Sequence, residues 1–177
     1  MKQVSEMSQG EVGAYVQSHL RQKSIDVVLS GGAAVAIYTS GKYVTHGIDL
    51  VNRYSAKRAS IKAAMEELGF ADQGRYFKHP NTGYFVEFPP GPLSIGDELD
   101  VKIEELHLET GILRVVSPTD SIKDRLAWFY HYGDAQCLSQ AVLIAHDHPI
   151  DLRNIEEWSK SEGKAREFKI FRKQLRG

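Results

Sequence analysis

The sequence predicts an α+β fold, with a core of helices and strands at residues 1–116 and a C-terminal helical segment at residues 117–177. Two observations support this prediction. Helical and strand patterns alternate along the first part in the order α-β-α-β-α-β-β, and from residue 117 onward the pattern is helical to the end. The length of 177 residues and the hydrophobic content of 42% suffice for one core, so we expect one compact unit.

The charge and cysteine content argue against several classes of protein. The 22 Lys and Arg residues nearly balance the 23 Asp and Glu residues, so no bulk attraction to nucleic acid or a membrane surface is expected. The single cysteine, Cys137, excludes an internal disulfide framework and a cysteine-rich zinc site. No apolar window approaches the ~18 residues of a membrane span. We therefore expect a cytoplasmic protein without a membrane partner.

The first elements follow from the spacing of apolar residues. Residues 8–23 carry apolar side chains at three- and four-residue steps, and Ser8 with Glu11 forms the pattern of a capping box, so a helix is predicted. A β-branched run at residues 25–29 predicts a strand. Ser30-Gly31-Gly32 ends this strand as a tight turn, and the small residues that follow, 33–38, predict a short helix.

The middle of the chain predicts a strand at residues 48–52 and a helix at residues 55–68 that Gly69 closes. Aromatic and apolar residues alternate at 74–79 and 83–88, and the PNTG between these two runs predicts a hairpin.

The remaining elements follow a loop rich in proline and glycine. LDVKIEEL and ILRVV each predict an edge strand. SPTD, at 117–120, is a helix-cap cluster. Helices are then expected at 120–132, 134–146, 151–161 and 164–175.

Two features of these elements concern chemistry. Ser30, Gly31 and Gly32 lie at the start of a predicted helix, where backbone N–H groups and a hydroxyl can hold phosphate oxygens, although glycine is also common in such turns for steric reasons alone. Asp49 and Glu87 stand in otherwise apolar strands, where a carboxylate is costly unless it is paired, hydrogen-bonded or bound to metal. The two carboxylates therefore point to a shared site.

The stretch SGGAAVAIYTSGKYVTHGIDLV resembles the signature of the nucleotidyltransferase superfamily that includes DNA polymerase beta. It is most similar to the small bacterial and archaeal members, among them the abortive-infection type toxins. Those proteins have a strand, a glycine turn, a short helix, a strand with Asp-x-Asp and a third acid on a later strand. On that pattern Ser30-Gly31-Gly32 matches the phosphate turn, Asp49 the second carboxylate and Glu87 the third, while Gly47 occupies the first carboxylate position.

The resemblance continues into the helical part and covers roughly residues 25–140. Relatives often place a basic residue about five positions after the Asp of a helix cap, and another Asp about nine positions further on. SPTDSIKDRLAWFYHYGD supplies Asp120, Arg125 and Asp134 at that spacing.

The resemblance implies a mixed, mainly antiparallel sheet flanked by helices, and transfer of a nucleoside monophosphate from an NTP to a hydroxyl of RNA, a protein or a small molecule. Two Mg²⁺ ions would serve as cofactors, with Asp49 and Glu87 as catalytic residues and metal ligands. Phosphate binding would fall to the following residues: Ser30, Gly31, Gly32, Lys42 and Arg125.

Gly47 removes one charged oxygen ligand, so we expect catalysis to be impaired by about 10²-fold or more. Three explanations are open: a substitution in an otherwise active enzyme, an inactive relative that still binds nucleotide, or replacement of the ligand by His46 or Asp100. Strand alternation places His46 on the face opposite Asp49. Asp100 is also a rival to Glu87 as the third acid, although its charged neighbourhood favours a solvated edge strand.

Two functions of other classes stand beside this one. The chain would be a non-catalytic nucleotide-binding module, such as one partner of a toxin–antitoxin pair, if it binds NTP without releasing pyrophosphate. A helical ribonuclease would use Arg125 and His131, but six residues of helix place these side chains about 120° apart. The run His146-Asp147-His148 resembles a metal patch, although adjacent residues at a helix end seldom converge on one ion.

Overall fold

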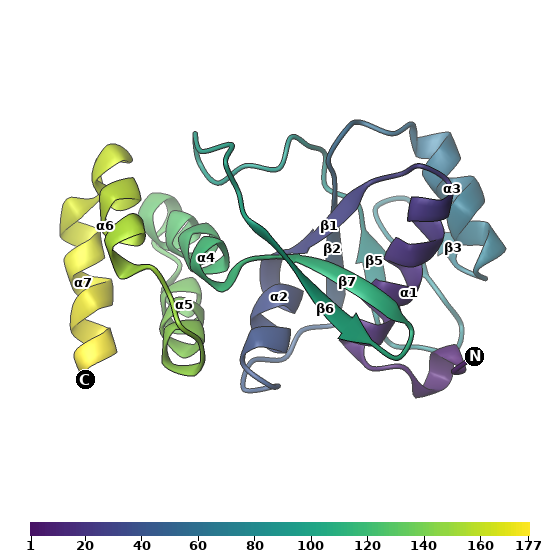
Figure 1. The fold of residues 1–177 in the computed structure, drawn as a ribbon, viewed down its shortest axis with the longest axis horizontal. Coiled ribbons are helices and arrows are strands. Elements are labelled where there is room, and N and C mark those ends of the chain that lie inside the picture. The colour runs from purple at the N-terminus through teal and green to yellow at the C-terminus, as the bar shows by residue number, and fades with distance from the viewer.

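The computed structural model describes residues 1–177 and contains one sheet of seven strands (Figure 1). The strands are β1 (Val27–Ser30), β2 (Gly47–Asn52), β3 (Ala71–Asp72), β4 (Phe77–Lys78), β5 (Phe85–Glu87), β6 (Ile103–Leu108) and β7 (Gly111–Val116). Their order across the sheet is β3-β4-β5-β2-β1-β7-β6. The pairs β1–β7 and β2–β5 are parallel, and the others are antiparallel. The predicted α+β class with a mixed, mainly antiparallel sheet is confirmed.

Seven α-helices accompany the sheet, after a short 3-10 helix at Val4–Glu6. They are α1 (Gln9–Gln22), α2 (Gly31–Tyr38), α3 (Arg58–Glu67), α4 (Pro118–Tyr132), α5 (Ala135–Asp147), α6 (Leu152–Ser161) and α7 (Ala165–Arg176). The four helices predicted for the C-terminal part are all present, with ends within two residues of the expected ones.

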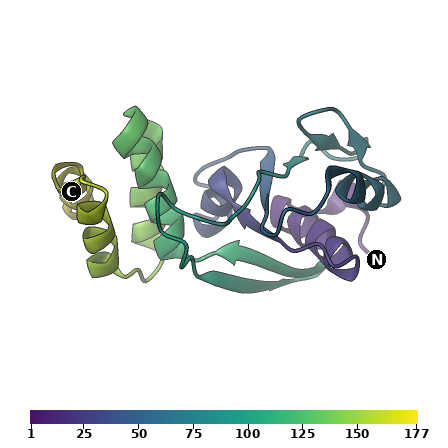
Figure 2. The ribbon, with the colours of Figure 1, turned by 90° about the horizontal axis from the view of Figure 1, so that it is seen from above.

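The sheet and the C-terminal helices lie at opposite ends of an elongated molecule (Figure 1). Seen from above, α4 and α5 stand between the sheet and the outer pair, α6 and α7 (Figure 2). One cluster of 35 buried apolar residues includes members from Met7 to Phe171. The division of the chain after residue 116 stays a prediction; in the structure β7 ends at Val116 and α4 begins at Pro118.

The two faces of the central strands have different surroundings. Ile48 and Leu50 of β2 are fully buried on the face that α1 covers. A Cβ on Gly13 of α1 would lie 3.1 Å from Leu113 and 3.8 Å from Ile48, which shows how closely the helix packs there. Because side chains alternate along a strand, Asp49 points to the opposite face. That open face holds the candidate site.

Capping residues define the helix starts as the sequence predicts. Ser8 accepts a hydrogen bond from the Glu11 N–H, and the Glu11 carboxylate accepts one from the Ser8 N–H, so the capping box is confirmed. Ser117 caps α4 and Asp134 caps α5 by accepting from backbone N–H groups. Gly133, at φ 67°, ends α4 in the left-handed conformation that glycine adopts without strain.

Helix α3 begins at Arg58, three residues later than the sequence predicts. Asn52 holds the preceding turn with its side chain, since its Oδ1 accepts from the Ala56 N–H at 3.0 Å and its Nδ2 donates to the Ala56 carbonyl at 2.9 Å. Ser55 has φ 55°, which is incompatible with a right-handed helix. A side-chain hydrogen bond therefore outcompetes the helical pattern in this turn.

The prediction of two edge strands after the loop is partly wrong. β7 lies inside the sheet, because it pairs with β1 on one side and β6 on the other. β6 begins at Ile103, since the backbone of Lys102 is already engaged by the start of α4: its N–H donates to Asp120 and its carbonyl accepts from the Ser117 N–H. The two-residue strand β3 was not predicted, and it extends the hairpin that was.

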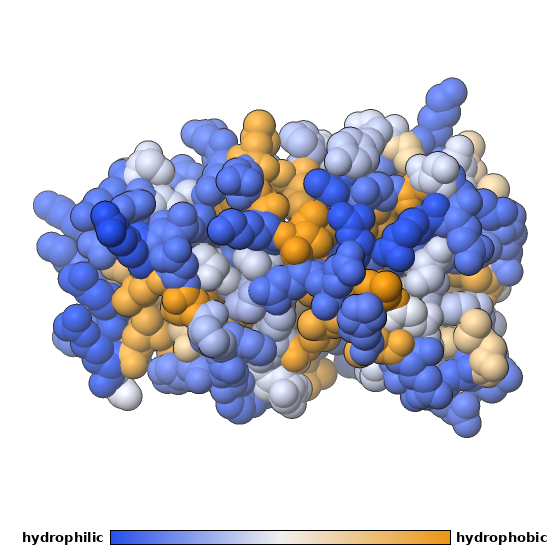
Figure 3. Space-filling view, in the orientation of Figure 1, coloured by the Kyte–Doolittle hydropathy of each residue, from blue (hydrophilic) through white to orange (hydrophobic).

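Polar side chains cover most of the face seen in Figure 1, and smaller apolar areas lie near its middle and toward the end of the outer helices (Figure 3). No helix combines the length and the apolar character that a membrane crossing requires.

Candidate functional site

The junction of β1 and α2 places a polar turn on the open face of the sheet. Ser30 is the last residue of β1 and the N-cap of α2, and its side chain makes no capping hydrogen bond. The first N–H groups of a helix have no partner within the helix, and they carry the positive end of its dipole. The Ser30 hydroxyl and the N–H groups of Gly31 and Gly32 therefore offer donors to an anion.

Gly31 is required here for two reasons. Its φ is +67°, a conformation that other residues adopt only with strain. A Cβ at this position would lie 2.6 Å from Oδ2 of Asp49, so the Asp49 carboxylate rests directly against the Gly31 backbone. At Gly32 a Cβ would lie 3.3 Å from the ring and from the hydroxyl oxygen of Tyr43, which therefore covers the start of the helix.

The sheet register brings Asp49 and Glu87 together. Asp49 of β2 is opposite Ser30 of β1 and opposite Glu87 of the parallel neighbour β5. Burial, followed by the charge of Glu87, raises the pKa of Asp49 to about 6, against the smaller opposing effect of Arg125. Glu87 has one ionic partner, the mostly exposed Arg75, with Nε 3.3 Å from Oε2. The acidic pair is thus largely uncompensated.

Arg125 on α4 faces this acidic pair from the helical part of the molecule. Its guanidinium donates to Oδ2 of Asp124 at 2.6 Å, and its side chain is only 12% exposed. Burial opposes the charged form, but Asp124 outweighs it, so the pKa of Arg125 is raised further above its ordinary value. The same side chain also contacts Cys137 and Gln140 of α5. These contacts hold a permanent positive charge near Asp49.

A cavity of about 200 Å³ adjoins Ser30 on this face. Asp124 lines it from α4, and the loop at residues 90–95 closes it from the other side. Val51 and Val116 contribute apolar walls. The arrangement therefore joins a turn with free donors, two carboxylates, one arginine and a partly apolar cavity.

Known structures with this arrangement of elements identify the fold. The structure is similar to the crystal structure of an antigenic nucleotidyltransferase-like protein from Paracoccidioides brasiliensis, with a TM-score of 0.56, 16% identity, and coverage of 77% of this chain and 76% of that one. It is also similar to the solution structure of the antibiotic-resistance factor ANT(2'')-Ia, with a TM-score of 0.53, 13% identity, and coverage of 92% and 95%. The chain has the nucleotidyltransferase fold. No protein-family model and no curated protein matches the sequence.

Within this nucleotidyltransferase fold, the ring of Phe85 occupies the space beside Gly47. Gly47 is opposite Phe85 in the parallel pair β2–β5, and a Cβ on Gly47 would lie 3.2 Å from Cε2 of Phe85. The Phe85 ring is itself packed on Tyr76, with ring centroids 4.9 Å apart. A carboxylate at position 47 would therefore require Phe85 to shift by a few tenths of an ångström or more.

The residues of the site fit a Mg²⁺ ion in part. Asp49 and Glu87 present two carboxylates on one face, and Asp49 has no ion pair within the protein while burial raises its pKa. A nearby cation would lower that pKa. No third His, Cys, Asp or Glu completes a group placed to hold a metal ion. Additional ligands would have to be phosphate oxygens or water.

Two predicted site residues lie elsewhere. Lys42, expected to bind phosphate, pairs with Asp147 at the end of α5, with Nζ 2.8 Å from Oδ1. Asp100, the rival metal ligand, is exposed and lines a separate hollow with Glu98 and Lys102, three strands away from β2 at the sheet edge. Neither residue makes an ion pair or hydrogen bond with Asp49 or Glu87, and their proposed roles stay predictions.

The residues of the two alternative sites, the ribonuclease pair and the histidine run, do not lie together. His131 is exposed and makes no contact with Arg125, as expected from their angular separation on α4. His146 contacts the Leu175 carbonyl, whereas His148 contacts the Tyr38 carbonyl and packs on the Tyr38 ring. The two histidines therefore contact different parts of the chain and do not converge on one ion.

Three residues of the site were missed from the sequence. Tyr43 covers the α2 start, Asp124 holds Arg125, and Phe85 fills the space beside Gly47. Only Asp124 carried a signal, as the acidic neighbour of Arg125 in KDR. The other two contacts depend on loop placement and on sheet register.

Proposed function

We propose that this chain binds a nucleoside triphosphate at the Ser30-Gly31-Gly32 turn and transfers its nucleoside monophosphate to a hydroxyl group, at a rate limited by the missing carboxylate at Gly47. The observation that carries this proposal is the convergence of the turn, the Asp49–Glu87 pair and Arg125 on one face of a nucleotidyltransferase fold.

Triphosphate binding is supported by the donors that the site leaves free. The Ser30 hydroxyl makes no capping bond, and the first N–H groups of α2 point away from the helix. Arg125 of α4 adds a fixed positive charge near Asp49. The cavity beside Ser30 has apolar walls at Val51 and Val116 that suit a flat ring such as a nucleobase.

The transfer step needs an acceptor hydroxyl in line with the α-phosphate. The hydroxyl oxygen forms a bond to the α-phosphorus, the bond to the bridging oxygen breaks, and pyrophosphate leaves. Mg²⁺ held by Asp49 and Glu87 would neutralise the phosphate charge and acidify the hydroxyl. The Asp49–Glu87 carboxylates are the nearest groups able to take the hydroxyl proton, and the turn and Arg125 hold the departing phosphates.

A small molecule is the acceptor class we favour. The similar structure ANT(2'')-Ia is described as an antibiotic-resistance factor, which associates this fold with a small-molecule target. The balance of 22 basic and 23 acidic residues gives no bulk attraction for RNA. RNA and protein hydroxyls are the competing acceptors in the test below.

The test separates nucleotide binding from transfer. Wild-type chain, Gly47→Asp and the double variant Gly47→Asp/Phe85→Leu are incubated with each labelled NTP, Mg²⁺ and three acceptor pools: cellular RNA, protein, and hydroxylated small molecules. We expect all three chains to bind NTP. Pyrophosphate release should rise by about 10-fold or more in the double variant, because the new carboxylate then has room beside Asp49.

Asp49→Asn introduced into each background is the matched control, and it should abolish any gain. Absence of NTP binding by the wild-type chain would refute the proposal outright. A gain that survives Asp49→Asn would show that the activity arises outside this site.

A second candidate is a non-catalytic nucleotide-binding module, such as one member of a toxin–antitoxin pair. The packing of Phe85 against Gly47 favours it, because this ring fills the space that a first carboxylate would need. It predicts saturable NTP binding without pyrophosphate release in the wild-type chain and in both variants.

A further inference from the structure

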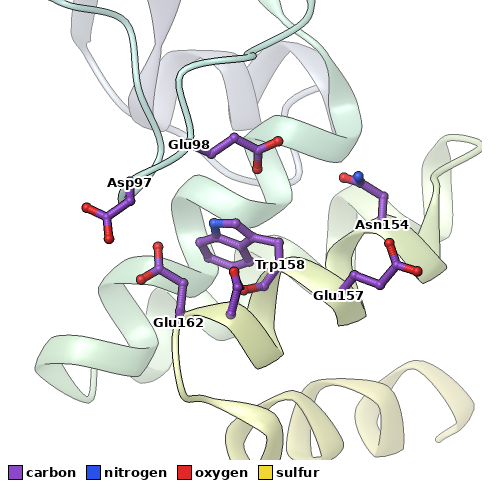
Figure 4. Close-up of a pocket in the computed structure, with 7 residues that line it drawn as sticks. Asp97, Glu98, Asn154, Glu157, Trp158 and Glu162 are labelled. Carbon is purple, nitrogen blue, oxygen red and sulfur yellow. The ribbon is translucent and has the colours of Figure 1, made fainter.

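Two pockets away from the nucleotide site carry charges of opposite sign. The pocket in Figure 4, between α6 and the loop that precedes β6, has four carboxylates, and because none of them is buried, water already solvates them. The other pocket, of about 360 Å³, lies where α1 leads into β1, and we call it the basic pocket. Its lining residues are Gln17, Arg21, Ser24, Ile25, Asp26, Val27, Tyr54 and Arg114.

The basic pocket is separate from the nucleotide site. Val27, the first residue of β1, lines the pocket, whereas Ser30 ends the same strand at the phosphate turn. Three residues of extended strand cover about 10 Å. The basic pocket shares no lining residue with the cavity beside Ser30, so each proposal can fail without the other.

Two mostly buried arginines at the basic pocket share a single carboxylate. Nη1 of Arg114 lies 3.2 Å from Oδ1 of Asp26, and Nη1 of Arg53 lies 3.5 Å from Oδ2. The two arginine side chains are only 22% and 23% exposed. Glu105 of β6 is opposite Arg114 in the sheet but makes no ion pair with it. Positive charge therefore stays uncompensated in a place where water solvates it poorly.

Arg21 adds a third guanidinium from the last turn of α1. It lines the pocket, and it takes part in no ion pair or side-chain hydrogen bond. A guanidinium offers five N–H donors in a planar fork that matches phosphate oxygens. Arg114 uses only Nη1 in a hydrogen bond, to Asp26. Most of the guanidinium donors are therefore free to bind an anion.

The backbone that carries these groups is fixed. Gln17 is 1% exposed, and its side chain both accepts from the Arg114 N–H and donates to the Arg114 carbonyl at 2.8 Å. The Arg53 N–H donates to the Asp26 carbonyl at 3.3 Å. A site whose charged residues are anchored in this way loses little conformational freedom when a ligand binds.

Tyr54 supplies an open aromatic surface at the basic pocket. Its side chain lines the pocket although the residue is 72% exposed. The guanidinium carbon of Arg53 lies 5.1 Å from the centroid of the ring, which places a cation against it. An aromatic ring with this much exposed surface can stack on a flat group of a ligand.

The excess charge selects the kind of anion. Three arginines against one aspartate leave two positive charges in excess. A phosphate monoester carries about −1.5 to −2 charge at neutral pH and has three strong acceptor oxygens, whereas a carboxylate carries a single charge.

We propose that the basic pocket binds a small phosphate monoester that carries a flat ring. The phosphate pairs with Arg21 and Arg114, and the ring stacks on Tyr54.

The test follows the backbone N–H signals of the ¹⁵N-labelled full chain by NMR, in chelator at about pH 8, where a phosphate monoester is doubly charged. The probe is phenyl phosphate, and inorganic phosphate and phenol are the matched compounds that lack the ring and the charge. We expect saturable shifts at residues 24–27 and none at Gly31 and Gly32. Inorganic phosphate should bind about 5-fold more weakly, and phenol should not saturate.

Two charge variants locate the phosphate. Arg21→Gln should weaken binding of phenyl phosphate by about 5-fold or more, and the fold should persist because Arg21 has no partner within the protein. Arg166→Gln, which removes the same charge from an exposed position on α7, should change binding by less than about 2-fold.

Tyr54→Ala tests the ring. This variant should bind phenyl phosphate no more tightly than it binds inorganic phosphate, because the stacking surface is gone. The proposal is overturned by the absence of a saturable shift at residues 24–27, by equal weakening in Arg21→Gln and Arg166→Gln, or by loss of the shifts in Arg125→Gln, which would place the probe in the nucleotide site.

Discussion

Two acids at the starts of the C-terminal helices, Asp120 and Asp134, and two acids on the open face of the sheet have opposite surroundings. Asp120 accepts from the Lys102 N–H at 2.7 Å and from the Ser117 hydroxyl, and Asp134 accepts from two backbone N–H groups at the start of α5. Asp49 makes no side-chain hydrogen bond within the protein, and Glu87 has only an exposed arginine as partner. Acids of the first kind hold the fold, and acids of the second kind are available to a ligand.

This difference separates residues that the sequence alone treats alike. Asp120, Arg125 and Asp134 all match the spacing that the resemblance predicts, yet Asp134 is the N-cap of α5, Asp120 lies in the first turn of α4, and only Arg125 faces the site. Spacing along a helix identifies residues that recur, whereas hydrogen-bond partners decide what each of them does.

The largest effect on the free energy of unfolding is expected at the contact between Gly31 and Asp49. Gly31→Ala places a Cβ 2.6 Å from Asp49 at a positive φ, so we expect the free energy of unfolding to fall by about 2–4 kcal/mol and NTP binding to be lost. Gly32→Ala is the control, since only Tyr43 must move and the loss should stay below about 1 kcal/mol. Urea unfolding measures both; equal losses would contradict the tight contact.

Neutralising Asp120, which lies in the first turn of α4, should weaken the fold. Asp120→Asn removes one of the two carboxylates near the ammonium of Lys123, which is 1% exposed, and alters the bonds to Lys102 and Ser117. We expect a loss of about 2–3 kcal/mol in the free energy of unfolding, because a buried charge loses compensation. Denaturant titration checks this value, and a neutral or stabilising effect would refute the structural role.

The same chemical change at the open face should have the opposite sign. Burial raises the pKa of Asp49 from 3.8 to about 6, so the folded chain holds this proton more tightly than the unfolded chain does. The stability that this group contributes is present below about pH 4 and is lost as the pH rises through about 6. At pH 7 the ionised carboxylate therefore opposes folding.

Asp49→Asn should accordingly raise the free energy of unfolding by about 1–2 kcal/mol at pH 7 in chelator, since each pKa unit corresponds to about 1.4 kcal/mol. The gain should disappear near pH 4. Unfolding curves at both pH values measure it, and destabilisation at pH 7 would show that Asp49 has an unrecognised structural partner.

The smallest effect is expected at Lys42. Its ion pair with Asp147 is exposed, so Lys42→Ala should change the free energy of unfolding by less than about 0.5 kcal/mol. Nucleotide affinity should change by less than about 2-fold, because the ammonium is directed to α5. A loss of nucleotide affinity as large as that of Arg125→Ala would show that Lys42 contacts the phosphates.

Local signals in the sequence were sufficient for the elements with strong caps or alternation. The capping box at Ser8, the hairpin that pairs Phe77 with Val86, and the four C-terminal helices were predicted from nearby residues. The later start of α3 and the interior place of β7 were not, because a side-chain turn at Asn52 and parallel pairing with β1 depend on tertiary contacts.

For the candidate site, the resemblance supplied the residues on the two strands and the turn, and the structure brings them together as expected. Lys42 and Asp100 lie apart from these residues in the structure, and their roles stay predictions, because loop residues carry no periodic signal that fixes their place. Tyr43 and Phe85 could not be found, since their importance comes from what they cover rather than from their own chemistry.

The packing of Phe85 beside Gly47 has a consequence for how this fold changes by mutation. An acid gained at position 47 meets the ring, and a smaller residue gained at position 85 alone leaves a gap beside Tyr76. Substitutions at the two positions will therefore be strongly non-additive. A scan of single substitutions would therefore underestimate the effect of each position. Whether an acid at position 47 can be gained without loss of stability depends on which of the two substitutions occurs first.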